Sequence, residues 1–177
     1  ALSALGADVV FVTGPADVAP PSGVEVIAVQ TAQQMLEAVQ TALPADVAIF
    51  AAAVADWRVE GASDRKLKKI KDGLPTLSFA ENPDILAHVS QLKTRRPALV
   101  VGFAAETNDV EANATAKLKR KGCDWIVAND VSPETGIMGG AENDVTLITA
   151  DGSEDWPRMG KSQVAQKLAA AIADALG

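Results

Sequence analysis

Short apolar runs alternate along this chain with segments of helical periodicity, and this alternation constrains the fold more than any other feature. Apolar runs predict buried strands, whereas apolar residues three or four positions apart predict helices. The expected strands are 8–13, 24–29, 46–54, 98–103 and 125–128, and the expected helices are 31–40, 82 onwards, 108–121 and 161–176. This order predicts an α/β fold, a Rossmann-like, doubly wound parallel sheet with helices on both faces.

The last third of the chain departs from this alternation. Residues 145–149 and the segment around Trp156, joined through Asp151 and Gly152, predict a C-terminal β-hairpin. The remaining segments are a charged loop, a short strand and a Gly-rich loop, expected at 57–73, 76–79 and 129–143.

The N-terminus has the pattern of a helix end, because the first residues are helix formers and Gly6 closes them. We therefore expect further chain upstream of Ala1. A length of 177 residues favours one domain, so we expect residues 1–177 to form a single, N-terminally incomplete domain.

Composition narrows the classes of partner. A net charge of -7 and a pI near 4.7 disfavour nucleic acid and anionic membranes, and no apolar run approaches the ~18 residues of a membrane span. The single cysteine, Cys123, excludes an internal disulfide and indicates a cytoplasmic location. We interpret Cys123 as a packing residue. The chain contains no P-loop motif, no Gly-x-Gly-x-x-Gly motif and no His/Cys cluster of the kind that binds zinc.

A basic segment stands out in this acidic chain. Five cations lie within seven positions, namely Arg65, Lys66, Lys68, Lys69 and Lys71. Such a run is either a solvated loop or a mobile loop that closes over a polyanion such as a nucleoside triphosphate. The second interpretation gains weight because the segment follows directly on the strand expected at 46–54.

Polar residues gather where the expected parallel strands end, at 53–56, 103–107 and 129–130. The carboxyl ends of such strands form the ligand-binding edge of an open sheet. Asp56 is either a ligand for Mg²⁺ or for a nucleotide donor, or a turn residue. The small residues before it either admit a ligand to the backbone or pack tightly against a helix. Phe103 either stacks on a base or packs in the core, and Gly102 permits close approach.

A second group of candidates lies on the helices. Asn82 is expected to cap a helix with Pro83 at its first position, so that free N–H groups and the positive dipole end face the same edge. The N–H groups at this helix start either bind polar groups of a nucleotide or are satisfied by a capping side chain alone. Lys117 and Lys121 are four apart on one helical face, where they either reach phosphates or are solvated.

The combination of these segments resembles one family. They lie at 51–58, 66–69, 82–85, 101–107, 117 with 121, and 128–130. In order and spacing they are similar to phosphopantothenoylcysteine synthetase, the CoaB domain of the bacterial bifunctional decarboxylase/synthetase (CoaBC, or Dfp). The resemblance implies a ligase of coenzyme A biosynthesis. The carboxylate of 4′-phosphopantothenate attacks the α-phosphate of CTP, pyrophosphate leaves, and the amine of cysteine then displaces CMP.

The resemblance also implies roles for individual residues. Lys66 would act catalytically on the phosphates, and Ala53 would lie close to the acyl intermediate. The implied nucleotide-binding residues are Ala51, Ala52, Asp56, Lys66, Pro83, Asp84, Ile85, Leu86, Phe103, Lys117 and Lys121, with Asp56 also contacting Mg²⁺ bound with CTP. The implied partners are CTP, 4′-phosphopantothenate, cysteine and a second copy in a homodimer, for which the terminal hairpin is the candidate interface.

The chain departs from the family pattern at its start. The family begins with a strand and a Gly-rich turn whose asparagine fixes the acyl intermediate, and the strand is central to the sheet; the chain lacks both. The flavin-dependent decarboxylase domain that usually precedes the family's synthetase domain, and would hold FMN, is absent too. Two alternatives stay open, an NAD(P)-binding oxidoreductase domain and a non-catalytic nucleotide-binding domain.

Overall fold

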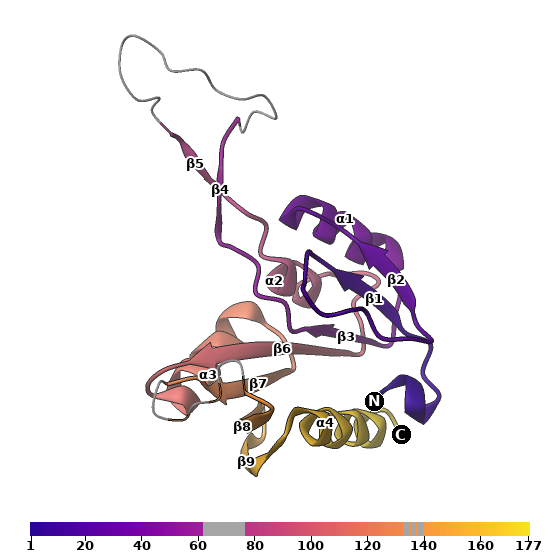
Figure 1. The fold of residues 1–177 in the computed structure, drawn as a ribbon, viewed down its shortest axis with the longest axis vertical. Coiled ribbons are helices and arrows are strands. Elements are labelled where there is room, and N and C mark those ends of the chain that lie inside the picture. Colours follow the sequence, from indigo (N-terminus) through magenta and orange to yellow (C-terminus); the bar gives the residue numbers. More distant parts are fainter. Residues whose placement is uncertain (62–76, 133–134, 136, 138–139) are drawn as a thin grey trace.

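The computed structural model describes residues 1–61, 77–132, 135, 137 and 140–177 (Figure 1). A short 3-10 helix at Ser3–Leu5 precedes four α-helices: α1 (Ala32–Ala42), α2 (Ile85–Ser90), α3 (Val110–Lys121) and α4 (Lys161–Leu176). The strands are β1 (Val10–Thr13), β2 (Glu25–Ala28), β3 (Val47–Phe50), β4 (Trp57–Val59), β5 (Phe79–Glu81), β6 (Leu99–Glu106), β7 (Trp125–Asp130), β8 (Glu142–Thr149) and β9 (Gly152–Gly160).

The main sheet has the strand order β3-β6-β7-β8-β9. Its first three strands are parallel, and the hairpin β8–β9 adds two antiparallel strands to the edge of β7. The mixed α/β class and the C-terminal hairpin are confirmed. The parallel strands do not form one continuous sheet, because β1 and β2 pair only with each other among the described residues.

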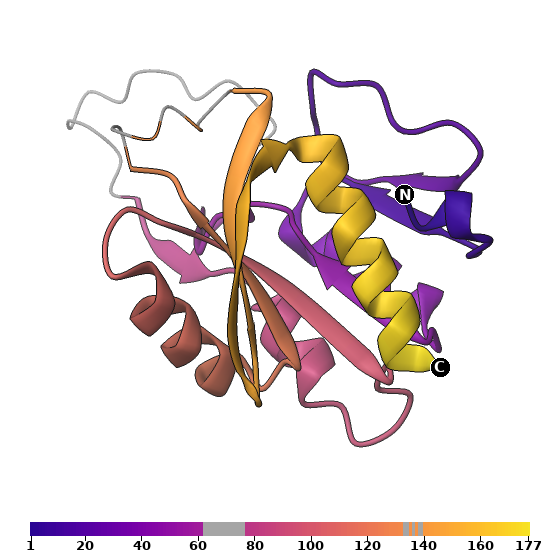
Figure 2. The same cartoon turned by 90° about the horizontal axis from the view of Figure 1, so that it is seen from below.

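Helices cover both faces of the main sheet, as predicted. Figure 2 shows α4 crossing one face, with α2 and α3 on the other. The long strand β6 is buried on both sides: Val100 and Ala104 pack with α2 and α3, whereas Leu99 and Val101 pack with α4. This division follows from the alternation of side chains along a strand. An apolar run without polar alternation is therefore what a central strand requires.

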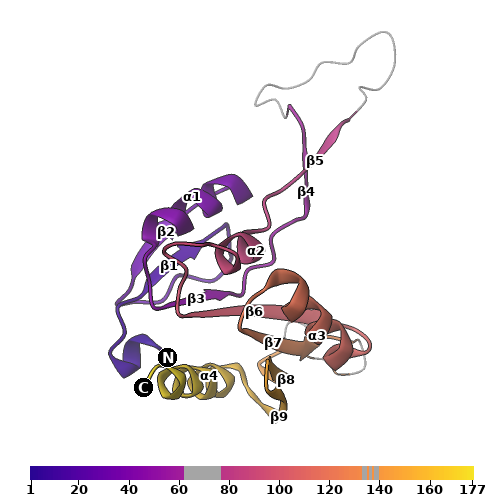
Figure 3. The same cartoon turned by 180° about the vertical axis from the view of Figure 1, so that it is seen from behind.

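Two sequence predictions differ from the structure around the basic segment. Residues 57–59 belong to a strand rather than to a charged loop, and the strand expected at 76–79 is β5, at Phe79–Glu81. β4 and β5 pair in antiparallel register and form an arm that projects from the body (Figures 1 and 3). β4 and β5 are held together by backbone hydrogen bonds between segments about twenty residues apart in the sequence. Backbone bonds of this kind leave no side-chain pattern from which the pairing could be predicted.

An arginine ties together the amino-terminal ends of β6 and β7. Arg96 donates from Nε to the carbonyl of Ser90 at 2.7 Å, and from Nη2 to both carboxylate oxygens of Asp124 at 3.0 and 2.9 Å. Asp124 Oδ2 in turn accepts the backbone N–H of Val100 at 2.7 Å. This ion pair joins the end of α2 to two strands of the sheet, and its hydrogen bonds are charge-assisted, which makes them stronger than bonds between neutral groups.

Cys123 lies in the core beside the same junction. Burial raises the pKa of its thiol to about 11, and the neighbouring Asp124 carboxylate adds to the rise. The thiolate is the reactive form of cysteine, so Cys123 is inert at neutral pH. The interpretation of Cys123 as a packing residue is confirmed.

Candidate functional site

The carboxyl end of β3 opens a notch in the main sheet. β3 ends at Phe50, opposite Gly102, while β6 continues for four further residues to Glu106. The following segment, 51–56, leaves the sheet toward the arm, and Ala51, Ala52 and Ala53 are exposed. From Phe103 onward, β6 therefore has no β3 neighbour on that side.

Asn82 fixes the chain where it enters and leaves the arm. Its side-chain amide donates to the carbonyl of Ala55 at 2.8 Å, and its backbone N–H donates to the carbonyl of Asp56 at 2.8 Å. The Asp56 side chain is exposed at the base of the arm. Asn82 is thus a clamp between two distant segments.

The prediction that Asn82 caps α2 is wrong. The N-cap is Asp84, whose Oδ1 accepts the N–H of Ala87 at 3.0 Å, so α2 begins at Ile85 and Pro83 lies before the cap. The dipole end that we expected to face a nucleotide already holds a carboxylate of the chain itself. The sequence could not decide between two good capping residues, because the choice depends on the contact between Asn82 and Ala55.

One of the two predicted lysines of α3 reaches the notch, and the other pairs with the N-cap of α2. The backbone N–H of Leu99 donates to the backbone carbonyl of Asp46, so the backbone groups of Leu99 face β3. Backbone groups two or four residues apart in a strand point to the same side, so those of Phe103 face that side too. Beyond the end of β3, Lys117 Nζ takes the place of a strand donor and donates to the Phe103 carbonyl at 3.0 Å. Lys121 forms an ion pair with Asp84. The structure therefore brings Asp84 and Lys121 together, whereas Lys117 meets the Phe103 carbonyl.

The pKa of Asp84 reflects this surrounding. Partial burial favours a higher pKa, but the Lys121 ammonium, the N–H of Ala87 and the charge of Arg120 together hold the pKa of Asp84 below its ordinary value. The carboxylate is therefore ionised throughout the neutral range.

Gly102 makes room for a helix rather than for a ligand. A Cβ at this position would lie 2.7 Å from Leu86 Cδ2 and 2.9 Å from Ile126 Cδ1. The Leu86 side chain of α2 therefore occupies the space that a side chain at position 102 would need. The close approach expected at Gly102 is thus made by α2.

Phe103 is separated from the predicted nucleotide-binding residues of α2. Its side chain packs against the cluster beneath α4, on the face of the sheet opposite Ile85 and Leu86, which pack with α2 and α3. The backbone of Phe103, and not its ring, meets Lys117. Lys66 and the rest of the basic segment lie outside the described residues.

One polar pair at the sheet edge was missed by sequence reasoning. Asn129, at the end of β7, accepts from Asn143 Nδ2 at 2.8 Å and donates to the carbonyl of Ala104 at 3.3 Å. Asn129 belongs to a predicted site segment, whereas no sequence motif includes Asn143. The two residues are fourteen positions apart across a loop, so only the folded chain brings them together. The pair joins β6, β7 and β8 where their polar ends meet.

Within the described ranges, no group of three or more His, Cys, Asp or Glu side chains is placed to hold a metal ion. Asp56 fits Mg²⁺ only as a single carboxylate ligand, which is the usual arrangement where phosphates supply the other oxygens. None of the helices in the described part of the chain is long and apolar enough to cross a membrane.

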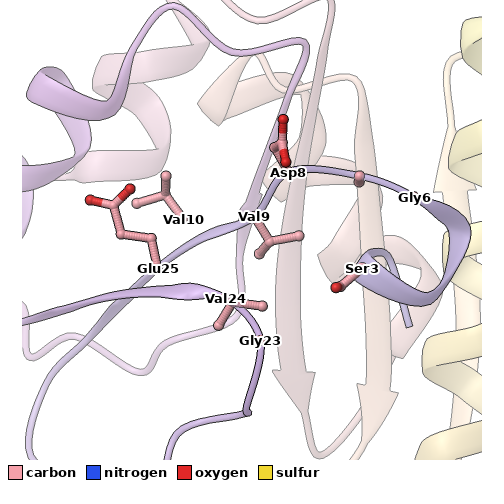
Figure 4. A pocket seen from close by; sticks show the side chains of 9 residues that line it. Ser3, Gly6, Asp8, Val9, Val10, Gly23, Val24 and Glu25 are labelled. Atoms are coloured by element: carbon pink, nitrogen blue, oxygen red, sulfur yellow. The ribbon is translucent and has the colours of Figure 1, made fainter.

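Two hollows in the described part of the chain lie away from this site, and the first is the larger of the two. It has a volume of about 460 Å³ and is open at the amino-terminal end of β1 and β2, where Asp8 and Glu25 contribute carboxylates (Figure 4). Negative charge makes it unsuitable for a triphosphate. A second hollow of about 230 Å³, at the carboxyl ends of β1 and β2, is lined by uncharged residues including Thr13 and Gln30. Neither contains a predicted site residue.

Comparisons with known proteins cover nearly the whole chain. The family model for the DNA/pantothenate metabolism flavoprotein C-terminal domain matches residues 1–176. The coenzyme A biosynthesis bifunctional protein CoaBC of Vibrio parahaemolyticus is 47% identical over 154 residues, which are 86% of this chain and 38% of the relative. CoaBC of Mycobacterium tuberculosis is 40% identical over 183 residues, covering 97% of this chain and 42% of that protein.

A solved structure agrees with these relatives. The crystal structure of the C-terminal domain of a CoaBC protein superposes with a TM-score of 0.77 at 35% identity, covering 98% of this chain and 77% of that one. The chain thus spans about two-fifths of the length of the curated relatives it matches.

Proposed function

This chain belongs to the family of the DNA/pantothenate metabolism flavoprotein C-terminal domain, and we propose that it carries a phosphopantothenate–cysteine ligase. In this reaction a carboxylate oxygen of 4′-phosphopantothenate bonds to the α-phosphorus of CTP, and pyrophosphate leaves. The amine of cysteine then attacks the acyl carbon, an amide forms, and CMP leaves. The relatives, named for coenzyme A biosynthesis, support this reaction.

The observation that carries the proposal is the Lys117 ammonium at the notch, with the Lys121 ammonium one helical turn further along α3. Two anions react in the first step, so cations must hold them together. Lys117 supplies a positive charge at the open edge of β6, and Lys121, one helical turn away on α3, supplies another beside Asp84. The exposed backbone of Ala51, Ala52 and Ala53 lies at the end of the neighbouring strand and leaves room for the nucleotide.

The other implied residues complete this assignment. Asp56 would bind Mg²⁺ together with the phosphates, and Lys66 would approach from the basic segment, which connects the two strands of the arm. Mg²⁺ would neutralise phosphate charge when bound with CTP. FMN would belong to a flavin-dependent decarboxylase domain in the same or an associated chain, as the word bifunctional in the relatives' names supports.

The alternatives have no comparable support. A dinucleotide-binding fold places pyrophosphate at a helix that directly follows a strand. The turn before that helix is rich in glycine, whereas the turns at 29–31, 82–84 and 107–109, which lead from a strand to a helix in the described part of this chain, contain none. Nothing in the geometry favours a non-catalytic role either.

The test is release of pyrophosphate from CTP. We expect it to require 4′-phosphopantothenate and Mg²⁺, and CMP to appear only when cysteine is added. The Asp56→Asn variant should need more Mg²⁺ and bind CTP more weakly, whereas Asp174→Asn, an exposed change on α4, should match the wild type. Unchanged CTP affinity and Mg²⁺ dependence in Asp56→Asn would refute the role of Asp56, and turnover of NADPH in place of CTP would refute the ligase.

We further propose that the protein is a cytoplasmic homodimer. The arm exposes Trp57 and Phe79, which are 58% and 63% accessible, and large apolar side chains at this density are typical of association surfaces. The exposed side chains of β9 are mostly polar, so the arm has better support than the terminal hairpin. Sedimentation velocity should give twice the mass of one chain; a single-chain mass at micromolar concentration would contradict the proposal.

A further inference from the structure

Each oxygen of the Asp84 carboxylate has a partner within the chain itself. One oxygen accepts the N–H of Ala87 as the cap of α2, and the other pairs with Lys121 at the end of α3. The capping bond fixes the carboxylate in space, because it closes the first turn of a helix that is packed on the sheet through Ile85 and Leu86. Asp84 is therefore a rigid anchor rather than a free acceptor.

Lys121 depends on this anchor for its position. Its side chain is only 19% exposed, and its ammonium pairs with Asp84 where α2 and α3 meet. A lysine side chain has large rotational entropy, so a lysine without a fixed partner occupies many rotamers. Lys117, one helical turn earlier, is held independently by the Phe103 carbonyl.

A direct contact from Asp84 to phosphate has no physical support, since like charges at contact distance repel. We propose that Asp84 is a positioning residue: it holds the Lys121 ammonium beside Lys117 so that both charges face the phosphates of the nucleotide. This inference rests on the proposed function and changes the role of Asp84 from nucleotide contact to support. The ammonium has three donors, so it binds the carboxylate and an incoming phosphate oxygen together.

The decisive variant is Asp84→Asn. Asparagine caps a helix as well as aspartate does, so α2 keeps its cap while the ion pair is lost. Two measurements follow, and the first needs no nucleotide. Brief acetylation with an N-hydroxysuccinimide ester, mapped by mass spectrometry, reports how firmly each lysine is held. We expect labelling of Lys121 to rise at least threefold in Asp84→Asn, with Lys117 unchanged as the internal control.

The second measurement is a double-mutant cycle on the Kd for CTP. Asp84→Asn should raise this Kd about fivefold, the size expected for a partly exposed ion pair. In the Lys121→Gln background the same change should leave Kd within about 1.5-fold. The effect should be smaller for CMP, which carries fewer phosphates. A structural role alone would change both backgrounds and both nucleotides equally.

Three outcomes would overturn the inference: unchanged labelling of Lys121, a Kd that stays constant or falls, or an equal loss in the Lys121→Gln background. A falling Kd would mean that Asp84 competes with the nucleotide for Lys121. These outcomes are distinct from failure of the proposed function. In that case the wild-type protein itself would not bind CTP, whereas labelling would still report whether Asp84 holds Lys121.

Discussion

Replacing Lys66 with alanine is expected to lower the turnover of the ligase about 100-fold, while the Kd for CTP rises less than about fivefold. The first step moves negative charge onto the leaving pyrophosphate, and a cation beside it stabilises the transition state more than the bound nucleotide. Lys117 and Lys121 remain in place to bind the ground state. The measurement is single-turnover pyrophosphate release at saturating substrates, with CTP binding by calorimetry.

The matched control is Lys93→Ala, which removes an exposed lysine from the loop between α2 and β6. Turnover of this variant should equal that of the wild type. If Lys66→Ala weakens CTP binding as much as it slows turnover, then Lys66 contributes uniform binding and not transition-state stabilisation. Arginine at position 66 should restore part of the rate, because it keeps the charge but changes its geometry.

The largest loss of stability is expected from Arg96→Ala, at about 3 kcal/mol of unfolding free energy. The substitution removes the hydrogen bond to Ser90 and leaves the half-buried Asp124 carboxylate without its cation. For a chain of this size the change should lower Tm by about 6–12 °C. Denaturant unfolding followed by circular dichroism would measure the free energy, and calorimetry the Tm.

Two variants separate the ion pair from general effects. Arg120→Ala, an exposed arginine on α3, should change the free energy of unfolding by no more than about 0.5 kcal/mol. Arg96→Lys should fall between wild type and alanine, because lysine keeps a charge but cannot bond Ser90 and Asp124 from separate nitrogens. A loss below about 1 kcal/mol for Arg96→Ala would show that the junction is held by packing instead.

Residues that act locally were predictable from the sequence. The apolar runs of β6 and β7 identify central strands, because burial on both faces leaves no place for polar alternation. Thr31 caps α1 through a local contact, because its hydroxyl oxygen accepts the backbone N–H of Gln34. Lys117 and Lys121 lie on one helical face because their spacing is four. The family resemblance rests on the same local segments, and the comparisons confirm it.

The arrangement between distant segments depended on tertiary structure. The sequence allows either Asn82 or Asp84 as the cap of α2, and the contact of Asn82 with Ala55 selects Asp84. Likewise, the partner of each lysine follows from where β3 ends and where α2 packs. These are competitions between contacts of similar energy, decided by which groups the packed core brings within reach. The sequence alone therefore determined the elements and the identity of the charges at the site, and only the tertiary structure decided how those charges are paired.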